Sequence, residues 1–198
     1  MRRSLQTGLK VSFLAVATFA LAWPLAVRAA APDGGPSAAE ILGRAEAQAR
    51  SEHKNILLDF DASWCGNCKL YDRFRDDPQM RPLLSRAFVF ATMVTGERPN
   101  DTKHANTPGG VAFEESIGGK DAGWPFIVML DAGGKPIVDS NRPDPASKTG
   151  KSNTGYPDAR EEVDWFVEML HRGAPSLSQQ DRASVQAWLN AHSTTQHR

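Results

Sequence analysis

Two cysteines, Cys65 and Cys68, are the only thiol side chains among the 198 residues, and they stand three positions apart. They follow an apolar run at 56–60 that is typical of a buried strand, and the residues after them have helical spacing. Side chains three apart in the first turn of a helix lie on one face, which brings the two sulfur atoms within bonding distance. Such a pair can exchange disulfides, form a structural bridge or contribute to a metal site.

Disulfide exchange is the chemistry that the position of the pair favours. At the start of a helix, Cys65 would meet unpaired backbone N–H groups and the positive end of the helix dipole, which stabilise a thiolate. The Cys65 thiolate would attack a disulfide, and Cys68 would then attack the mixed disulfide and release the partner. Gly66 would let a partner chain approach closely.

A structural bridge and a metal site are the alternatives for this pair. A bridge between Cys65 and Cys68 closes so small a loop that it restricts the unfolded chain little. A zinc site needs further ligands, but there is no second C-x-x-C and the five histidines are scattered. We therefore expect no metal and no cofactor. Two alternative functions stay open, a peptide-binding module with a permanently bridged pair and a metal-handling protein.

The first 29 residues have the pattern of a secretory signal peptide. Arg2 and Arg3 precede an apolar run at 11–27, and small residues follow it. An uncleaved membrane anchor is the alternative, although 17 residues are few for a membrane span. Removing the leader takes away four of the 23 basic residues and none of the 23 acidic ones, which leaves a net charge of about −4. That charge argues against nucleic acid as a partner.

The rest of the chain alternates predicted helices and strands. Ser37 and Glu40 have the spacing of a capping box, which predicts that a helix begins after a linker at 30–36. A strand–helix–strand unit followed by a hairpin and two helices predicts an α/β fold with a central mixed sheet flanked by helices. Two stretches without periodicity, 95–110 and 141–158, are expected to be long loops. Helices are predicted at 38–50, from Cys65 to Asp77 with a short continuation after Pro78, at 111–117, at 159–171 and from Ser178 onwards; strands are predicted at 56–60, 88–94, 126–130 and 136–140.

Two segments together resemble the thioredoxin superfamily. The segment D-F-D-A-S-W-C-G-N-C-K at 59–69 resembles the active-site segment of that family, and G-W-P-F-I-V-M-L-D-A-G-G-K-P-I at 123–137 resembles its proline loop and hairpin. The likeness is greatest to exported thioredoxin-like proteins with a split helix after the cysteines. It implies a thioredoxin-like domain at 37–174, followed by a C-terminal helical extension at 175–198.

The resemblance also implies a role for each residue of the site. Cys65 corresponds to the exposed nucleophile and Cys68 to the buried resolving thiol. Asp59 corresponds to the buried acid that helps to deprotonate the resolving cysteine, and burial should raise its pKa toward the working pH. Pro125 corresponds to a cis-proline that lies against the disulfide and leaves the preceding backbone free to pair with a substrate strand. The residues implied to bind substrate are Trp64, Gly66, Trp124 and Pro125.

The chain departs from the family pattern at three positions. Asn67 stands where the family often has Pro or His, and it can offer the Cys65 thiolate only a hydrogen bond. Asp61 replaces an aromatic residue and adds a negative charge nearby, which disfavours the thiolate. Trp124 is bulky where the family more often has Thr or Val, so it narrows the groove or packs against the motif. The departure at Asn67 favours a reductant or exchanger over a strong oxidant.

The sequence as a whole predicts an exported thiol–disulfide oxidoreductase that uses Cys65 and Cys68. After cleavage of the leader we expect a periplasmic or secreted monomer. Its substrates would be disulfides and dithiols in proteins. Electrons would come from a membrane-bound donor, because an oxidising compartment has no thiol pool of its own.

Overall fold

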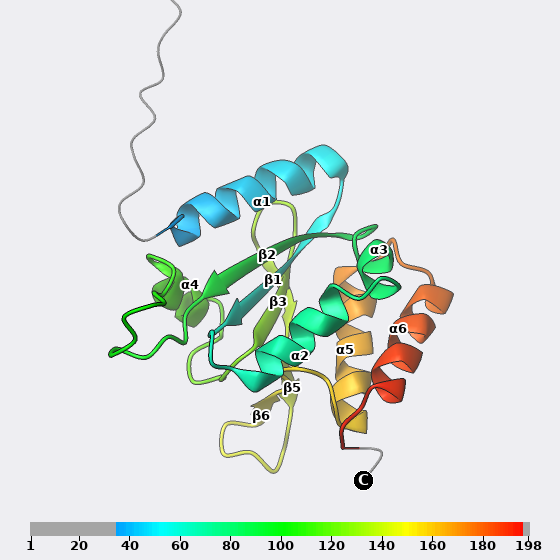
Figure 1. The fold of residues 1–198 in the computed structure, drawn as a ribbon. Helices are drawn as coiled ribbons and strands as arrows, with labels where there is room; N and C mark the ends of the chain where they lie inside the picture. The colour runs from blue at the N-terminus through cyan, green and yellow to red at the C-terminus, as the bar shows by residue number, and fades with distance from the viewer. Residues whose placement is uncertain (1–34, 196–198) are drawn as a thin grey trace, which may run out of the picture. The chain divides into compact units, whose positions relative to one another are not determined.

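Figure 1 shows the computed structural model of the protein, which describes residues 35–195. The predicted signal peptide at 1–29, and with it the membrane-anchor alternative, lies outside the described residues. None of the helices in the described range has the length and apolar character that crossing a membrane requires.

The helices are α1 (Ala38–Glu52), α2 (Gly66–Arg75), α3 (Met80–Leu84), α4 (Gly110–Ser116), α5 (Arg160–Gly173) and α6 (Gln179–Ala191). The strands are β1 (Asn55–Asp61), β2 (Phe88–Val94), β3 (Phe126–Leu130), β4 (Pro136–Asp139), β5 (Asn141–Pro143) and β6 (Lys151–Asn153).

The main sheet has four strands in the order β2-β1-β3-β4. Strand β1 runs parallel to β2 and antiparallel to β3, and β3 runs antiparallel to β4. The five central residues of β1 and all five residues of β3 are buried, as expected for inner strands that are covered on both faces. The predicted mixed sheet flanked by helices is confirmed.

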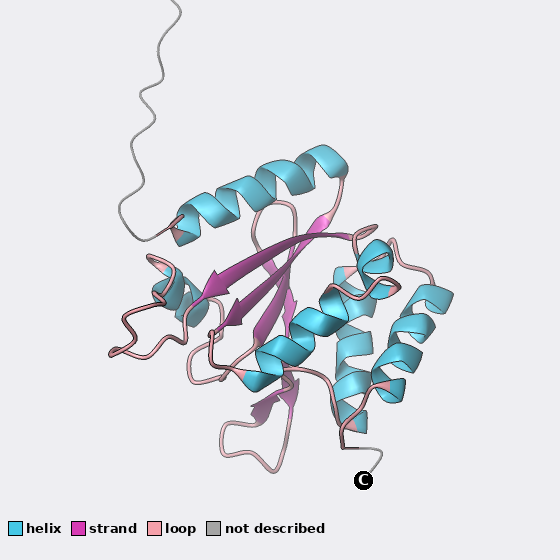
Figure 2. Ribbon diagram, viewed as in Figure 1, coloured by secondary structure: helices cyan, strands magenta, loops and turns pink. Residues whose placement is uncertain are grey.

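Side chains of β1 alternate between two apolar clusters, one on each face of the sheet. Leu57 belongs to the cluster with α2, α3, α5 and α6, whereas Ile56 and Leu58 belong to the cluster with α1. Figure 2 shows these helices on the two sides of the strands. Because the side chains of a strand alternate, Asp59 shares the face of Leu57 and points toward the layer of α2.

The ends of two helices follow the sequence signals closely. Ser37 and Glu40 form the predicted capping box at the start of α1. Ser178 and Asp181 form a second box at the start of α6. Val185 and Leu189 of α6 are fully buried, in the same cluster as residues of α2 and α5. The last helix therefore completes the core on the α2 side of the sheet.

The expectation of a structureless loop at 141–158 is wrong in part. Strands β5 and β6 pair antiparallel as a separate two-stranded sheet, with Asn141 opposite Asn153. Figures 1 and 2 show this hairpin beyond the end of the main sheet. Each strand has three residues, none of them is buried, and most of their side chains are polar. So short and polar a pair carries no apolar alternation that a sequence pattern could detect.

Candidate active site

The Cys65–Cys68 pair lies at the start of α2, where the turn after β1 enters the helix. The two cysteines are joined by a disulfide with their Cα atoms 5.3 Å apart. Cys68 is buried as expected, at 2% exposure, but Cys65 is also buried, at 5%, so the expectation of an exposed Cys65 is wrong for the disulfide form. Cys65 is the N-cap residue of α2, and its Sγ accepts a hydrogen bond from the Cys68 N–H at 3.0 Å. In the reduced protein, the same donor and the helix dipole would stabilise a thiolate at Cys65.

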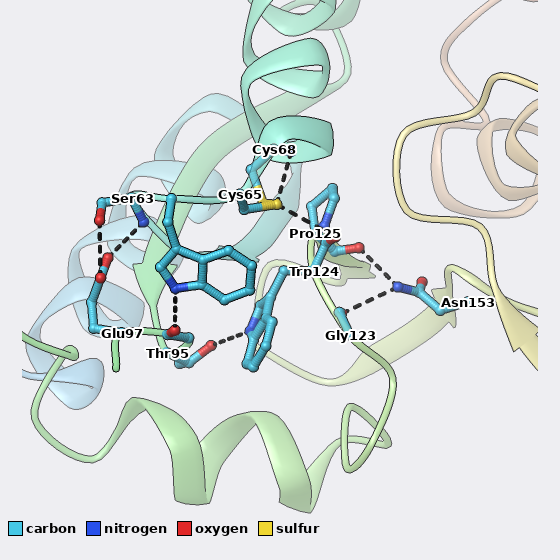
Figure 3. Close-up of a disulfide and its surroundings, with 11 residues drawn as sticks. Ser63, Cys65, Cys68, Thr95, Glu97, Gly123, Trp124, Pro125 and Asn153 are labelled. Atoms are coloured by element: carbon cyan, nitrogen blue, oxygen red, sulfur yellow. Dashed lines mark hydrogen bonds between the residues drawn. A yellow bond between two sulfur atoms is a disulfide. The ribbon is translucent and has the colours of Figure 1, made fainter. Parts of the chain in front are cut away.

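The loop before β3 brings Trp124 and Pro125 against the disulfide, as Figure 3 shows. The peptide bond between these two residues is cis. The carbonyl oxygen of Trp124 lies 3.5 Å from Cys65 Sγ. The Trp124 side chain packs on an apolar cluster that Ala62 forms with the two cysteines. Four of the predicted site residues therefore meet at one place: Cys65, Cys68, Trp124 and Pro125.

Two indole rings border the disulfide. Trp64 is 44% exposed, and its ring meets that of Trp124 edge-on with centroids 5.8 Å apart. The Trp64 Nε1–H donates to the carbonyl of Gly96 at 2.8 Å, and the Arg98 guanidinium lies over the Trp64 ring. Gly66 is exposed, and a Cβ added there would meet nothing within 4 Å. The surface beside the sulfur atoms is therefore partly aromatic and open at Gly66.

Glu97, in the loop after β2, is a site residue that the sequence reasoning missed. Its side chain is largely buried and accepts hydrogen bonds from the Ser63 N–H at 2.6 Å and the Ser63 hydroxyl at 2.9 Å. The backbone N–H of Glu97 donates to Asn106 Oδ1 at 2.8 Å. These bonds fix the loop to the residues immediately before Cys65. No sequence signal identified Glu97, because it stands in a polar segment without periodicity.

Gly96 has no room for a side chain in this arrangement. A Cβ there would lie 2.7 Å from the Ala62 Cβ and 2.7 Å from Cε2 of Trp124. The backbone of the loop can therefore approach both the cysteine segment and the proline loop only because residue 96 is glycine. Its carbonyl is the acceptor for Trp64, so this close approach also orients the exposed indole.

Asp59 lies in the core, 1% exposed, beneath the face of α2. Arg75 Nη1 donates to its carboxylate at 2.9 Å, and the Thr92 hydroxyl donates at 3.2 Å. Burial raises the pKa of Asp59 to about 7, although the Arg75 charge opposes the rise. Burial also raises the pKa of neighbouring Asp61, and the negative charge of Asp72 adds to this rise.

Arg75 is the second residue that the sequence reasoning missed. It stands seven positions after Cys68, so both side chains project from the same side of α2. Besides Asp59, its guanidinium contacts Asp72 at 2.9 Å and Asp76 at 3.2 Å. The helical phase of the cysteines could have indicated that Arg75 lies on the same side of α2 as Cys68.

Within residues 35–195, two groups of side chains each bring three metal-ligand atoms within 4.8 Å of one another. One group is Glu97, Asp101 and His104, and the other is Asp59, Asp61 and Asp72. In the first group, Asp101 is already bound to His104 and to backbone N–H groups. In the second, Arg75 supplies the positive charge. Neither group includes a cysteine, and we assign no metal to either.

These observations define the class of protein: a mixed α/β sheet that carries a two-cysteine disulfide at a helix start, facing a proline loop. Comparisons with known proteins agree with this class. Residues 39–132 match the family model described as thioredoxin-like. The thiol:disulfide interchange protein DsbD of Photorhabdus laumondii subsp. laumondii is 29% identical over 92 residues, which are 46% of this chain and 14% of that protein.

Two solved structures are also similar. One is the disulphide isomerase from Xylella fastidiosa Temecula1, with a TM-score of 0.44 and 17% identity over 75% of this chain and 87% of that chain. The other, titled DsbH Oxidoreductase, has a TM-score of 0.40 and 19% identity over 78% of this chain and 95% of that chain. The match to a thioredoxin-like family model over residues 39–132, which include the Cys65–Cys68 pair, agrees with the resemblance to the thioredoxin superfamily that the motifs predict.

Proposed function

We propose that the protein is an exported thiol–disulfide oxidoreductase that exchanges disulfides with other proteins through Cys65 and Cys68. The observation that carries the proposal is the position of the pair: Cys65 caps α2, and its sulfur lies 3.5 Å from the Trp124 carbonyl in the proline loop. A guest chain that lies along this loop would bring its own sulfur to Cys65. Trp64, Gly66, Trp124 and Pro125 would border that guest.

In the reducing direction, the Cys65 thiolate attacks one sulfur of a substrate disulfide. A mixed disulfide forms, and the first substrate thiolate leaves and takes a proton from water. Cys68 then loses its proton and attacks the Cys65 sulfur, so that the second substrate thiolate leaves and is protonated. The substrate gains two electrons and two protons, and the Cys65–Cys68 disulfide forms again. A membrane-bound donor would return the two electrons.

Asp59 suits the role of proton acceptor for Cys68 in this cycle. A pKa of about 7 allows the carboxyl group to take up and release a proton near neutral pH. The burial that raises this pKa also excludes bulk solvent from the face of α2. Arg75 would stabilise the charged form of Asp59 between turnovers.

A reducing or exchanging role is favoured over strong oxidation. Asp61 adds negative charge near the cysteines, and Asn67 is exposed and brings no positive charge. Both features make the Cys65 thiolate less stable than a histidine in the motif would. A less stable dithiol form gives electrons away more readily, which is the property of a reductant.

The test is insulin reduction with dithiothreitol as the electron source. Cys65→Ser should lower turnover to the uncatalysed rate, because the nucleophile is lost. Cys68→Ser should accumulate a mixed disulfide visible on a non-reducing gel. The double Ser variant is the control for both. Equal and full activity of both single variants would falsify the proposal.

The alternative is a peptide-binding module in which the Cys65–Cys68 bridge is permanent. The burial of both sulfurs beside the proline loop favours it, since a guest could bind there without any exchange. The reduction potential separates the two functions. A value below about −300 mV indicates a structural bridge, and a higher value indicates a redox pair.

Export and the membrane donor depend on residues 1–29. Fractionation of cells that make the full chain tests this part of the proposal. We expect the protein in the periplasmic or secreted fraction, shortened at its N-terminus, whereas a full-length chain in the membrane fraction would indicate the uncleaved anchor. We expect it to elute as a monomer on size-exclusion chromatography.

A further inference from the structure

The β5–β6 hairpin reaches back to the proline loop through one side chain, Asn153. Asn153 is the last residue of β6. Its Nδ2 donates to the carbonyl of Gly123 at 3.2 Å and to the carbonyl of Pro125 at 3.0 Å. Figure 3 shows this carboxamide and the disulfide on opposite sides of the proline loop. The hairpin, which had no predicted function, is thus attached to the loop that faces Cys65.

The orientation of the Asn153 carboxamide is set by two donors on its oxygen. The Ser140 hydroxyl donates to Oδ1 at 2.6 Å, and the Gly155 N–H donates to it at 3.2 Å. Ser140 is fully buried, and its hydroxyl oxygen accepts from the Ile127 N–H at 2.9 Å. The two donors to Oδ1 leave the nitrogen facing the two carbonyls, which can only accept.

The carbonyls that Asn153 holds stand on either side of Trp124. The carbonyl between them, that of Trp124, lies 3.5 Å from Cys65 Sγ. Of three consecutive carbonyls, the first and third thus accept hydrogen bonds from Asn153, and the second faces the Cys65 sulfur. Holding the carbonyls of Gly123 and Pro125 in place restricts the rotation of the peptide unit that carries the Trp124 carbonyl.

The backbone after Asn153 also packs on the proline ring. A Cβ built on Gly155 would lie 3.6 Å from Cδ of Pro125, and Gly155 has a φ of +58°. Glycine adopts this left-handed conformation at little cost, so it lets the chain turn back at this contact. The end of the hairpin therefore supports the loop through both hydrogen bonds and contact.

We propose that Asn153 is a positioning residue for disulfide exchange, which holds the Trp124–Pro125 loop in register with Cys65. The inference deepens the proposed function and rests on it. Asn153 does not touch the sulfur atoms, so its effect is on the binding of a guest protein along the loop. Exchange with a small dithiol, which needs no groove, should depend on it little.

The experiment compares Asn153→Ala with a matched control in the same hairpin, Asn141→Ala. Asn141 Nδ2 also donates to a backbone carbonyl, but to that of Gly118, away from the proline loop. We expect Asn153→Ala to raise KM for insulin about tenfold, the effect of roughly one to two lost hydrogen bonds, and Asn141→Ala to leave it within about twofold. The rate at which dithiothreitol reduces the Cys65–Cys68 bridge should stay within about twofold in both variants.

Hydrogen exchange gives a readout that needs no substrate. Loss of Asn153 frees the Ser140 hydroxyl from its acceptor, so the Ile127 amide should exchange faster in Asn153→Ala than in Asn141→Ala. If the wild-type protein is active and Asn153→Ala and Asn141→Ala have equal KM values for insulin, Asn153 has no positioning role. Wild-type protein that reduces insulin no faster than Cys65→Ser overturns the proposed function instead. Equal Ile127 exchange in the two variants overturns the support of the loop by Asn153, whatever the activity.

Discussion

Two supports hold irregular backbone beside the disulfide, and they use opposite chemistry. On the side of the cysteine segment, Glu97 accepts hydrogen bonds from the N–H and hydroxyl of Ser63. On the side of the proline loop, Asn153 donates to the carbonyls of Gly123 and Pro125. Both supports come from segments that had no assigned function. They differ because the backbone groups that need partners differ.

Ser63 lies in the turn between β1 and α2, outside both the strand and the helix, so its N–H needs an acceptor from elsewhere in the chain. An acceptor such as a carboxylate satisfies it. The proline loop has the opposite shortage, since proline carries no N–H and its neighbours present carbonyls. Only a hydrogen-bond donor can satisfy these carbonyl oxygens. The choice of Glu at one support and Asn at the other follows from the local backbone.

Replacing the buried acid Asp59 should have the largest effect on stability. The pKa of Asp59 is about 7 in the folded protein and near 3.8 when unfolded, so the folded state holds a proton that the unfolded state has lost between these values. The oxidised wild type should therefore lose roughly 4 kcal/mol of unfolding free energy as pH rises from about 4 to 7. Asp59→Asn should remove this slope.

Urea unfolding at a series of pH values measures the slope. Asp72→Asn is the control, because it removes another carboxylate that contacts Arg75 but leaves Asp59 in place. Most of the slope should remain in Asp72→Asn. A slope that persists in Asp59→Asn would show that another group carries it.

Asn153→Asp should produce the next largest effect. The change replaces the donor with a carboxylate that faces two carbonyl oxygens, and neither carbonyl can donate in return. We expect a loss of about 3 kcal/mol in unfolding free energy at pH 7, because an uncompensated charge is left half-buried. The loss should shrink at low pH, where the new carboxyl group is protonated and can donate once. A stability equal to that of Asn153→Ala at every pH would contradict this account.

Glu97→Ala and Glu97→Gln sharpen the comparison with smaller effects. Alanine leaves the Ser63 N–H and hydroxyl without their acceptors, which should cost about 2 kcal/mol. Glutamine keeps one oxygen for the N–H, and its amide can donate to the hydroxyl oxygen, so the loss should be below about 1 kcal/mol. Chemical denaturation of the oxidised variants measures both. If Glu97→Gln were as destabilising as Asn153→Asp, the contrast between an acceptor at residue 97 and a donor at residue 153 would be wrong.

The sequence was sufficient for the parts of the site that depend on local spacing. The position of the cysteines at a helix start follows from an apolar run and a C-x-x-C, whereas the burial of Asp59 was implied by the resemblance to the thioredoxin superfamily. The capping box at the start of α1 was predictable from local spacing, because Ser37 and Glu40 stand three positions apart.

The supports could not be predicted, because their partners are far apart along the chain. Ser63 and Glu97 are separated by 34 positions, and Pro125 and Asn153 by 28. A polar residue in a loop without periodicity gives no indication of which backbone groups it will meet. Arg75 is an intermediate case, since its helical phase was readable but its partner on β1 was not.

The burial of α6 has a consequence for when the protein can fold. Val185 and Leu189 stand near the end of the chain but pack in the same cluster as Phe74 of the helix that Cys65 caps. The buried face of α2 is therefore fully covered only after residue 189 has been synthesised, more than 100 residues after Cys68. Until that moment the two cysteines belong to a chain in which α6 does not yet cover the core beneath α2.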